Sequence, residues 1–106
     1  MDKAIASVLL DAFVHRLRQR KYSELCEFLG APECEEVWGP DGKAYQVEFE
    51  AHWDDPRNRG RNLRVIASID DGTFRATFRP ITKGFIMAPD GSFVGEPQNE
   101  SQFSSL

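Results

Sequence analysis

The first twenty residues have the hydrophobic pattern of an amphipathic helix. Between Lys3 and Arg20, apolar residues recur at intervals of three and four, as one face of a helix requires. A helix of this kind gains most of its stability by packing its apolar face on the rest of a domain. The residues that define the predicted face are Ile5, Val8, Leu9, Ala12, Phe13 and Leu17, and Leu10 and Val14 widen it.

A second, shorter helix is predicted after a break near Lys21. Ser23 is a suitable N-cap, and Glu24 lies favourably in the first turn. Gly30, directly after Leu29, is typical of a C-terminal stop. We therefore expect this helix to run from Ser23 to Leu29.

Beyond a turn signal at residues 39–42, apolar and polar residues alternate, which is typical of half-buried β-strands. The predicted strands are 45–53, 63–70, 74–79 and 84–88, with a short return at 92–94 and an edge strand at 37–38.

The two turns between the central strands predict a register. A symmetric loop over residues 54–62 and a two-residue turn at residues 71–72 place the apolar residues of three strands on one face. The predicted pairs are Trp53 with Leu63, Ala51 with Val65, Phe49 with Ala67, Ile69 with Phe74, Ala67 with Ala76, and Val65 with Phe78.

Helices that precede a run of antiparallel strands indicate an α+β fold. We expect residues 1–96 to form one domain, in which two N-terminal helices pack on one face of an antiparallel four- to five-stranded meander sheet. The order of elements also resembles that of cystatin-like and NTF2-like curved-sheet folds. The polar residues 97–106 are expected to form a disordered tail.

Length and composition suit a domain that folds without cofactors. The 106 residues allow one core, and eight Phe supply large buried areas. Cys26 and Cys34 are expected to be free thiols, and neither His15 nor His52 has ligand-like spacing to a cysteine, so we expect no metal. No segment has the apolar length of a signal peptide or a membrane span, which predicts a cytoplasmic protein without a membrane partner.

Charge is unevenly distributed along the chain. Residues 32–50 contain six acidic residues and one basic residue. Trp38 closely follows the acidic cluster of this segment, which consists of Glu33, Glu35 and Glu36. An acidic rim around an aromatic anchor is suited to a basic protein partner. On this basis the leading functional hypothesis is a non-catalytic protein-interaction domain, such as an immunity or accessory protein. For Trp38 itself the favoured interpretation is the simpler one, that it covers an edge of the core.

The second hypothesis is a small-molecule-binding or catalytic domain with a pocket between helix and sheet. In the predicted register His52 stands beside Arg64 on the polar face, with Arg79 on the next strand and Glu50 along the same face. A histidine next to a carboxylate can act as a general base, and arginines can hold an anionic substrate. Rows of charged residues are also typical of a half-solvated sheet, and the chain contains no nucleophile motif. We therefore assign no catalytic residue, favour a role without catalysis, and leave an enzyme open.

Two further features of the chain bear on possible partners. The basic run at residues 15–21 raises the alternative of a nucleic-acid interface. The chain is acidic overall, with a net charge of −4, and cations in the last turn of a helix favourably oppose its dipole, so a solvated helix end is favoured. An unpaired strand edge near Phe85–Ala88 would also permit a homodimer through the sheet edge.

Two stretches resemble a family of small bacterial proteins of uncharacterised function. They are NLRVIASIDDG at 62–72 and GFIMAPDGSFVGE at 84–96, of which the hairpin from Phe85 to Glu96 is the more distinctive. The resemblance covers the C-terminal half of the chain. It implies a shape built from turns and apolar alternation, and it brings no activity or catalytic residue with it.

Overall fold

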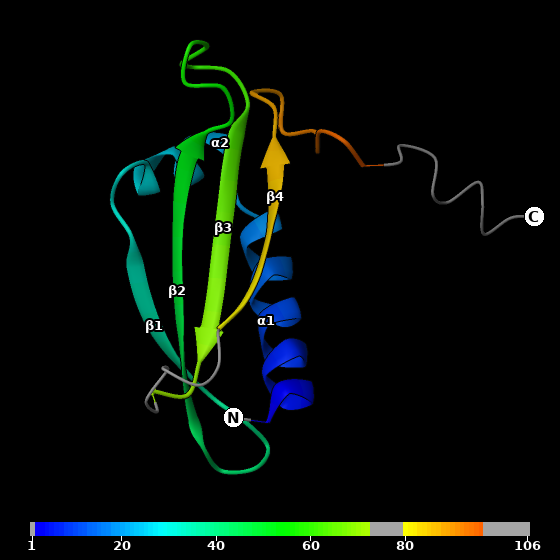
Figure 1. Cartoon of the computed structure of the whole chain (residues 1–106). Helices are drawn as coiled ribbons and strands as arrows, with labels where there is room; N and C mark the ends of the chain where they lie inside the picture. The colour runs from blue at the N-terminus through cyan, green and yellow to red at the C-terminus, as the bar shows by residue number, and fades with distance from the viewer. Residues whose placement is uncertain (1, 73–79, 97–106) are drawn as a thin grey trace, which may run out of the picture.

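A computed structural model, which describes residues 2–72 and 80–96, contains both the predicted helices and the predicted sheet (Figure 1). Two helices and a four-stranded antiparallel meander, in the order β1-β2-β3-β4, confirm the predicted α+β class. The elements are α1 (Lys3–Arg18), α2 (Tyr22–Leu25), the 3-10 helix η1 (Cys26–Phe28), β1 (Glu33–Trp38), β2 (Ala44–Trp53), β3 (Leu63–Asp70) and β4 (Ile81–Met87).

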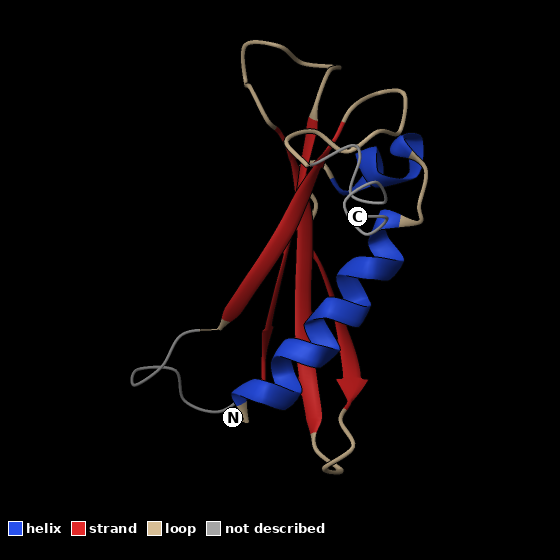
Figure 2. Cartoon of the chain, turned by 90° about the vertical axis from the view of Figure 1, so that its right-hand side faces the viewer, coloured by secondary structure: helices blue, strands red, loops and turns tan. Residues whose placement is uncertain are grey.

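Helix α1 lies across one face of the sheet, as Figure 2 shows, and contacts β3 and β4. Asp2 caps its start, because the Asp2 side chain accepts a hydrogen bond from the backbone N–H of Ile5 at 3.0 Å. The predicted face was wrong for Val8 and Ala12, which are exposed. The helix is apolar on two overlapping stripes, and the stripe that includes Leu10 is the one that packs on the sheet. It consists of Ala6, Leu10, Phe13 and Leu17.

The second helix begins earlier and ends sooner than predicted. Its N-cap is Lys21, whose backbone N–H donates to the Glu24 side chain at 2.8 Å. Because Glu24 caps this N–H from within the first turn, the helix starts at Tyr22 and Ser23 lies inside it. From Cys26 the chain continues as the 3-10 helix η1.

The register predicted for the two central strands is confirmed. Trp53 lies opposite Leu63, Ala51 opposite Val65, and Phe49 opposite Ala67. All the even-numbered residues of β2 therefore point to the face opposite the core. The alternating core residues of the sheet are Tyr45, Val47, Phe49, Ala51, Leu63, Val65, Ala67, Ile69, Phe85 and Met87.

The two edges of the sheet differ from the sequence prediction. Strand β1 covers six residues rather than Val37–Trp38 alone, because its backbone pairs with β2 as far as Glu33 opposite Phe49. The predicted strand 74–79 lies outside the described residues. The neighbour of β3 is β4, which places Ile81 rather than Phe74 opposite Ile69. The other two partners predicted from the strand 74–79 are also replaced by residues of β4. Val65 lies opposite Phe85, and Ala67 lies opposite Lys83.

The segment after β4 is attached to the end of α1. Arg18 forms a two-pronged ion pair with Glu96, with N···O distances of 2.6 and 2.7 Å. Its guanidinium also lies 3.8 Å from the ring centroid of Phe93, which packs edge-on against Phe85. The ion pair lowers the pKa of the Glu96 carboxyl below its usual value. The C-terminal hairpin is thereby fixed to the helix by charge and by aromatic packing.

Tyr45 closes the core at the end where β1 and β2 join. Its ring is buried, and its hydroxyl donates to the Asp41 carboxylate at 2.9 Å. Burial, together with this carboxylate, raises the pKa of Tyr45 to about 12. The folded protein therefore holds the Tyr45 proton in a pH range where the unfolded chain releases it.

We predict that this phenol makes stability depend on pH in alkali. The contribution of Tyr45 is complete below about pH 10, where both states are protonated, and is lost as pH rises toward about 12. Urea unfolding across this window should show a steeper loss of stability for the native chain than for Tyr45→Phe. Parallel pH profiles for the two proteins would contradict the prediction.

Candidate functional site

The face of the sheet opposite α1, called the open face, has a mixed polar and apolar surface. In the stretches 2–72 and 80–96, no helix packs against it. Because side chains alternate along a strand, its members follow from the register. They are Cys34, Glu36 and Trp38 of β1, Gln46, Glu48, Glu50 and His52 of β2, Arg64, Ile66, Ser68 and Asp70 of β3, and Thr82, Gly84 and Ile86 of β4.

Trp38 is an exposed aromatic side chain on this face. The Trp38 side chain is 65% exposed. In the described part of the chain, Val8 is the only other large hydrophobic residue that is exposed. Glu36 lies on the same side of β1, where the Gln46 amide donates to its carboxylate at 3.4 Å. The structure therefore brings Trp38 and Glu36 together, and Trp38 does not serve as a cover for the core.

The other two carboxylates of the predicted cluster point to the opposite side of β1. Glu33 and Glu35 occupy the alternate positions, on the face that carries α1. Glu35 lines a hollow of about 120 Å³ together with Arg16 of α1 and Arg20, which follows the helix. Glu35 thus lies on the α1 side of β1, whereas Trp38 lies on the open face.

Strand β2 extends the acidic surface beyond Glu36. Glu48 is exposed opposite Cys34, and Glu50 is the next residue of β2 on the same face. Glu48 lies within the acidic segment Glu33–Glu50 that the interaction hypothesis invoked, and the alternation of β2 places it on the polar face, as predicted. Carboxylates of two neighbouring strands consequently share one surface with Trp38.

The residues of the predicted pocket come together only in part. His52 Nε2 lies 3.3 Å from Glu50 Oε1, and His52 is paired with Arg64 across the strands as predicted. The Arg64 guanidinium donates to the Asp54 carboxylate at 2.7 Å, which already neutralises it. Arg79 lies outside the described residues, and the position beside Arg64 on β4 is occupied by Ile86.

The hollow beside His52 does not lie between helix and sheet. It is an open surface depression of about 380 Å³, lined by His52 and Trp53 together with Gly30 and Arg59 from the adjoining loops. Arg64 is not among its lining residues. The space between α1 and the sheet is filled by apolar side chains, and the described residues contain no buried side-chain polar atom without a hydrogen bond.

Within the described residues, the Cys26 thiol and the charges of the loop between β2 and β3 add no further site. Burial raises the pKa of the Cys26 thiol, the reverse of what an activated nucleophile requires. In the loop between β2 and β3, the Arg57 side chain pairs with Asp55 at 3.2 Å. The Tyr22 hydroxyl donates to the Arg61 carbonyl at 2.5 Å and holds the same loop against α2.

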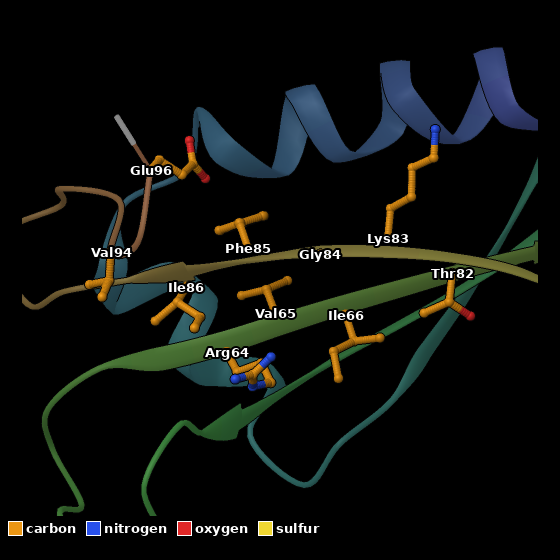
Figure 3. A pocket seen from close by; sticks show the side chains of 10 residues that line it. All are labelled: Arg64, Val65, Ile66, Thr82, Lys83, Gly84, Phe85, Ile86, Val94 and Glu96. Carbon is orange, nitrogen blue, oxygen red and sulfur yellow. The ribbon is translucent and has the colours of Figure 1, made fainter. Parts of the chain in front are cut away.

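Another hollow lies at the β4 edge of the sheet, around Gly84 (Figure 3). It measures about 400 Å³ and follows β4 on both of its faces. The absence of a side chain at Gly84 leaves a gap between Thr82 and Ile86, beside Ile66 of the neighbouring strand. No sequence motif pointed to this place, because an isolated glycine within a strand indicates a close backbone approach without naming a ligand.

Searches of known protein families, of curated proteins and of solved structures found no match to this chain. None of the helices in the described ranges is long and apolar enough to cross a membrane. The same ranges contain no group of three or more His, Cys, Asp or Glu residues placed to hold a metal ion. Cys26 and Cys34 carry free thiols in the structure.

Proposed function

We propose that the chain is a non-catalytic protein-interaction domain that binds a basic protein partner on the open face, as an immunity or accessory protein would. The observation that carries the proposal is the 65% exposure of Trp38 on a sheet face that also bears Glu36, Glu48 and Glu50. A large aromatic side chain flanked by carboxylates is the arrangement of an anchor with an acidic surround.

The chemistry of the face supports binding more than catalysis. Arg64 is paired with Asp54, and His52 contacts Glu50 on an open surface instead of inside a pocket that excludes water. A partner that buries Trp38 would remove a large apolar surface from water, while its lysines or arginines approach Glu36 and Glu48. The aromatic contact would supply most of the affinity, and the carboxylates would speed encounter and select for basic partners.

Affinity capture from the native host, followed by calorimetry with the captured partner, tests this proposal. We expect Trp38→Ala to weaken binding about 30-fold, which corresponds to roughly 2 kcal/mol for a central aromatic anchor. Glu36→Lys should also weaken binding, and it should reduce the dependence of the association rate on salt.

Glu35→Lys is a matched control, since it makes the same charge change one residue away on the opposite face of β1. It should alter the affinity much less than Glu36→Lys. If Trp38→Ala and Glu36→Lys leave the affinity unchanged, or if Glu35→Lys has the larger effect, the open face is not the binding surface.

A further inference from the structure

The backbone of β4 has unused hydrogen-bonding groups along its outer edge. In an antiparallel ladder each residue directs its N–H and C=O together, either toward the neighbouring strand or away from it. The Ile86 carbonyl accepts from the Val94 N–H at 2.8 Å, on the side away from β3. By the same alternation Thr82 and Gly84 also point outward, and no acceptor or donor among residues 2–72 and 80–96 meets their backbone groups.

A second hydrogen bond shows independently that Ile86 and its alternate residues direct their backbone groups away from β3. It joins the Asp54 N–H to the Asn62 carbonyl at 2.9 Å. It makes residues 54 and 62 a bonded pair, so that Arg64, two residues further, directs its backbone toward β2. The pair of Arg64 with Ile86 is then the non-bonded kind. Both ends of the ladder therefore agree on which groups of β4 face outward.

This edge coincides with the hollow around Gly84. The hollow of about 400 Å³ is bounded at one end by Val94 and Glu96, and its walls include Ile66 and Ile86 (Figure 3). An added strand would place one residue directly opposite Gly84, with its side chain over the gap. Glycine in a sheet is stabilised by an aromatic residue across from it, because the ring covers the backbone that the missing side chain exposes.

We propose that the outer edge of β4 is a strand-addition site for an extended segment of another protein, with an aromatic residue opposite Gly84. Backbone hydrogen bonds to Thr82 and Gly84 would supply the affinity, and the gap at Gly84 would select the side chain. The site lies at the opposite edge of the sheet from Trp38. It does not depend on the proposed function, and either surface can fail without the other.

A second copy of the chain is a poorer occupant of this edge. Val94 already bonds the Ile86 carbonyl, which leaves Thr82 and Gly84 for pairing. A two-fold antiparallel pair that matches Thr82 with Gly84 sets the two Lys83 residues directly opposite each other. Like charges in that position are destabilising, and the Asp11 carboxylate, 2.5 Å from the Lys83 amine, offsets only part of this repulsion. A foreign segment without a lysine at that position avoids this repulsion.

The test uses the full chain and a capped peptide of sequence KTVTFTVTK as probe. In a nuclear magnetic resonance titration, the peptide should shift the backbone amide signals of Thr82 and Gly84. A peptide with alanine in place of the central phenylalanine should bind about 10-fold more weakly, and methylation of the central backbone nitrogen should have at least the same effect.

Thr82→Pro supplies the matching change in the protein. Its N–H points outward, so the substitution removes a donor for the peptide without breaking a bond to β3, as proline on an edge strand permits. We expect a folded protein with at least 10-fold weaker peptide binding, whereas Thr82→Val, which keeps the N–H, should bind normally. Unchanged binding by a folded Thr82→Pro overturns the proposal, as does a shift confined to residues around Trp38.

Hydrogen exchange in the protein without peptide tests whether the edge is open. The amides of Thr82 and Gly84 should exchange rapidly, while that of Phe85, bonded to β3, should be protected. Protection of Thr82 and Gly84 at every protein concentration would assign the edge to another segment of the same chain. Protection that grows with concentration would assign it to a second copy, and either result overturns the proposal.

Discussion

Replacing Leu10 by alanine should lower the free energy of unfolding by about 3 kcal/mol, within the range measured for buried leucines. Leu10 is fully buried at the middle of α1, in the layer between the helix and the sheet. Removing its outer methyl groups loses their burial and leaves a cavity that rigid neighbours on β3 and β4 cannot fill. Urea denaturation followed by circular dichroism measures the change.

Val8→Ala is the matched control for this experiment. It also shortens an aliphatic side chain in α1, but Val8 is 67% exposed, so the expected change is within about 0.5 kcal/mol. Comparable losses at the two positions would mean that α1 presents a different face to the sheet. The comparison thus tests the packing of the helix as well as the size of the core.

The same pair of residues shows where helix prediction reached its limit. Apolar periodicity predicted a helix between Lys3 and Arg20 that packs on a sheet, and the structure contains such a helix over Lys3–Arg18. The prediction centred the face on the stripe that contains Val8 and treated Leu10 as a residue at its margin, since both satisfy intervals of three and four. The choice depends on which side chains fill the space above β3 and β4, a long-range property that local spacing does not contain.

Strand prediction succeeded where alternation and turn length agreed. The loop from Asp54 to Asn62 and the alternation on either side set Trp53 opposite Leu63, as found. Strand β4 was harder to recognise because Lys83 lies on its inward face and Gly84 interrupts its outward face. Lys83 is accommodated there by the Asp11 carboxylate and the Ser7 hydroxyl of α1, contacts between residues more than 70 positions apart.

For the candidate site, the sequence placed the acidic residues and Trp38 in one segment but did not predict on which face of the strand each side chain lies. Glu33, Glu35, Glu36 and Trp38 appeared as one cluster, whereas pairing of the whole of β1 divides them between two faces. Acidic residues have low strand propensity, so the local sequence gave no reason to extend β1 back to Glu33. Pairing with β2 overrides that preference, and it also brings Glu48 onto the same surface as Trp38.

Gly84→Ala should destabilise the protein by about 2 kcal/mol, a large effect for the addition of one methyl group. A β-carbon at this position would lie 2.3 Å from the carbonyl oxygen of Val65, which is backbone and cannot rotate away. The strand would have to move from β3, weakening the pairs on either side of Gly84. Denaturation in urea, with hydrogen exchange at the Phe85 amide, would detect both consequences.

Thr82→Ala provides the comparison, because it changes the same strand on the same face without adding an atom. It loses only the contact between the Thr82 and Ser68 hydroxyls, at 3.1 Å, and the expected change is below about 1 kcal/mol. A stability for Gly84→Ala equal to that of Thr82→Ala would show that the backbone of β4 does not approach Val65 so closely. The gap at Gly84 would then not be imposed by the backbone, and a larger side chain could fill it.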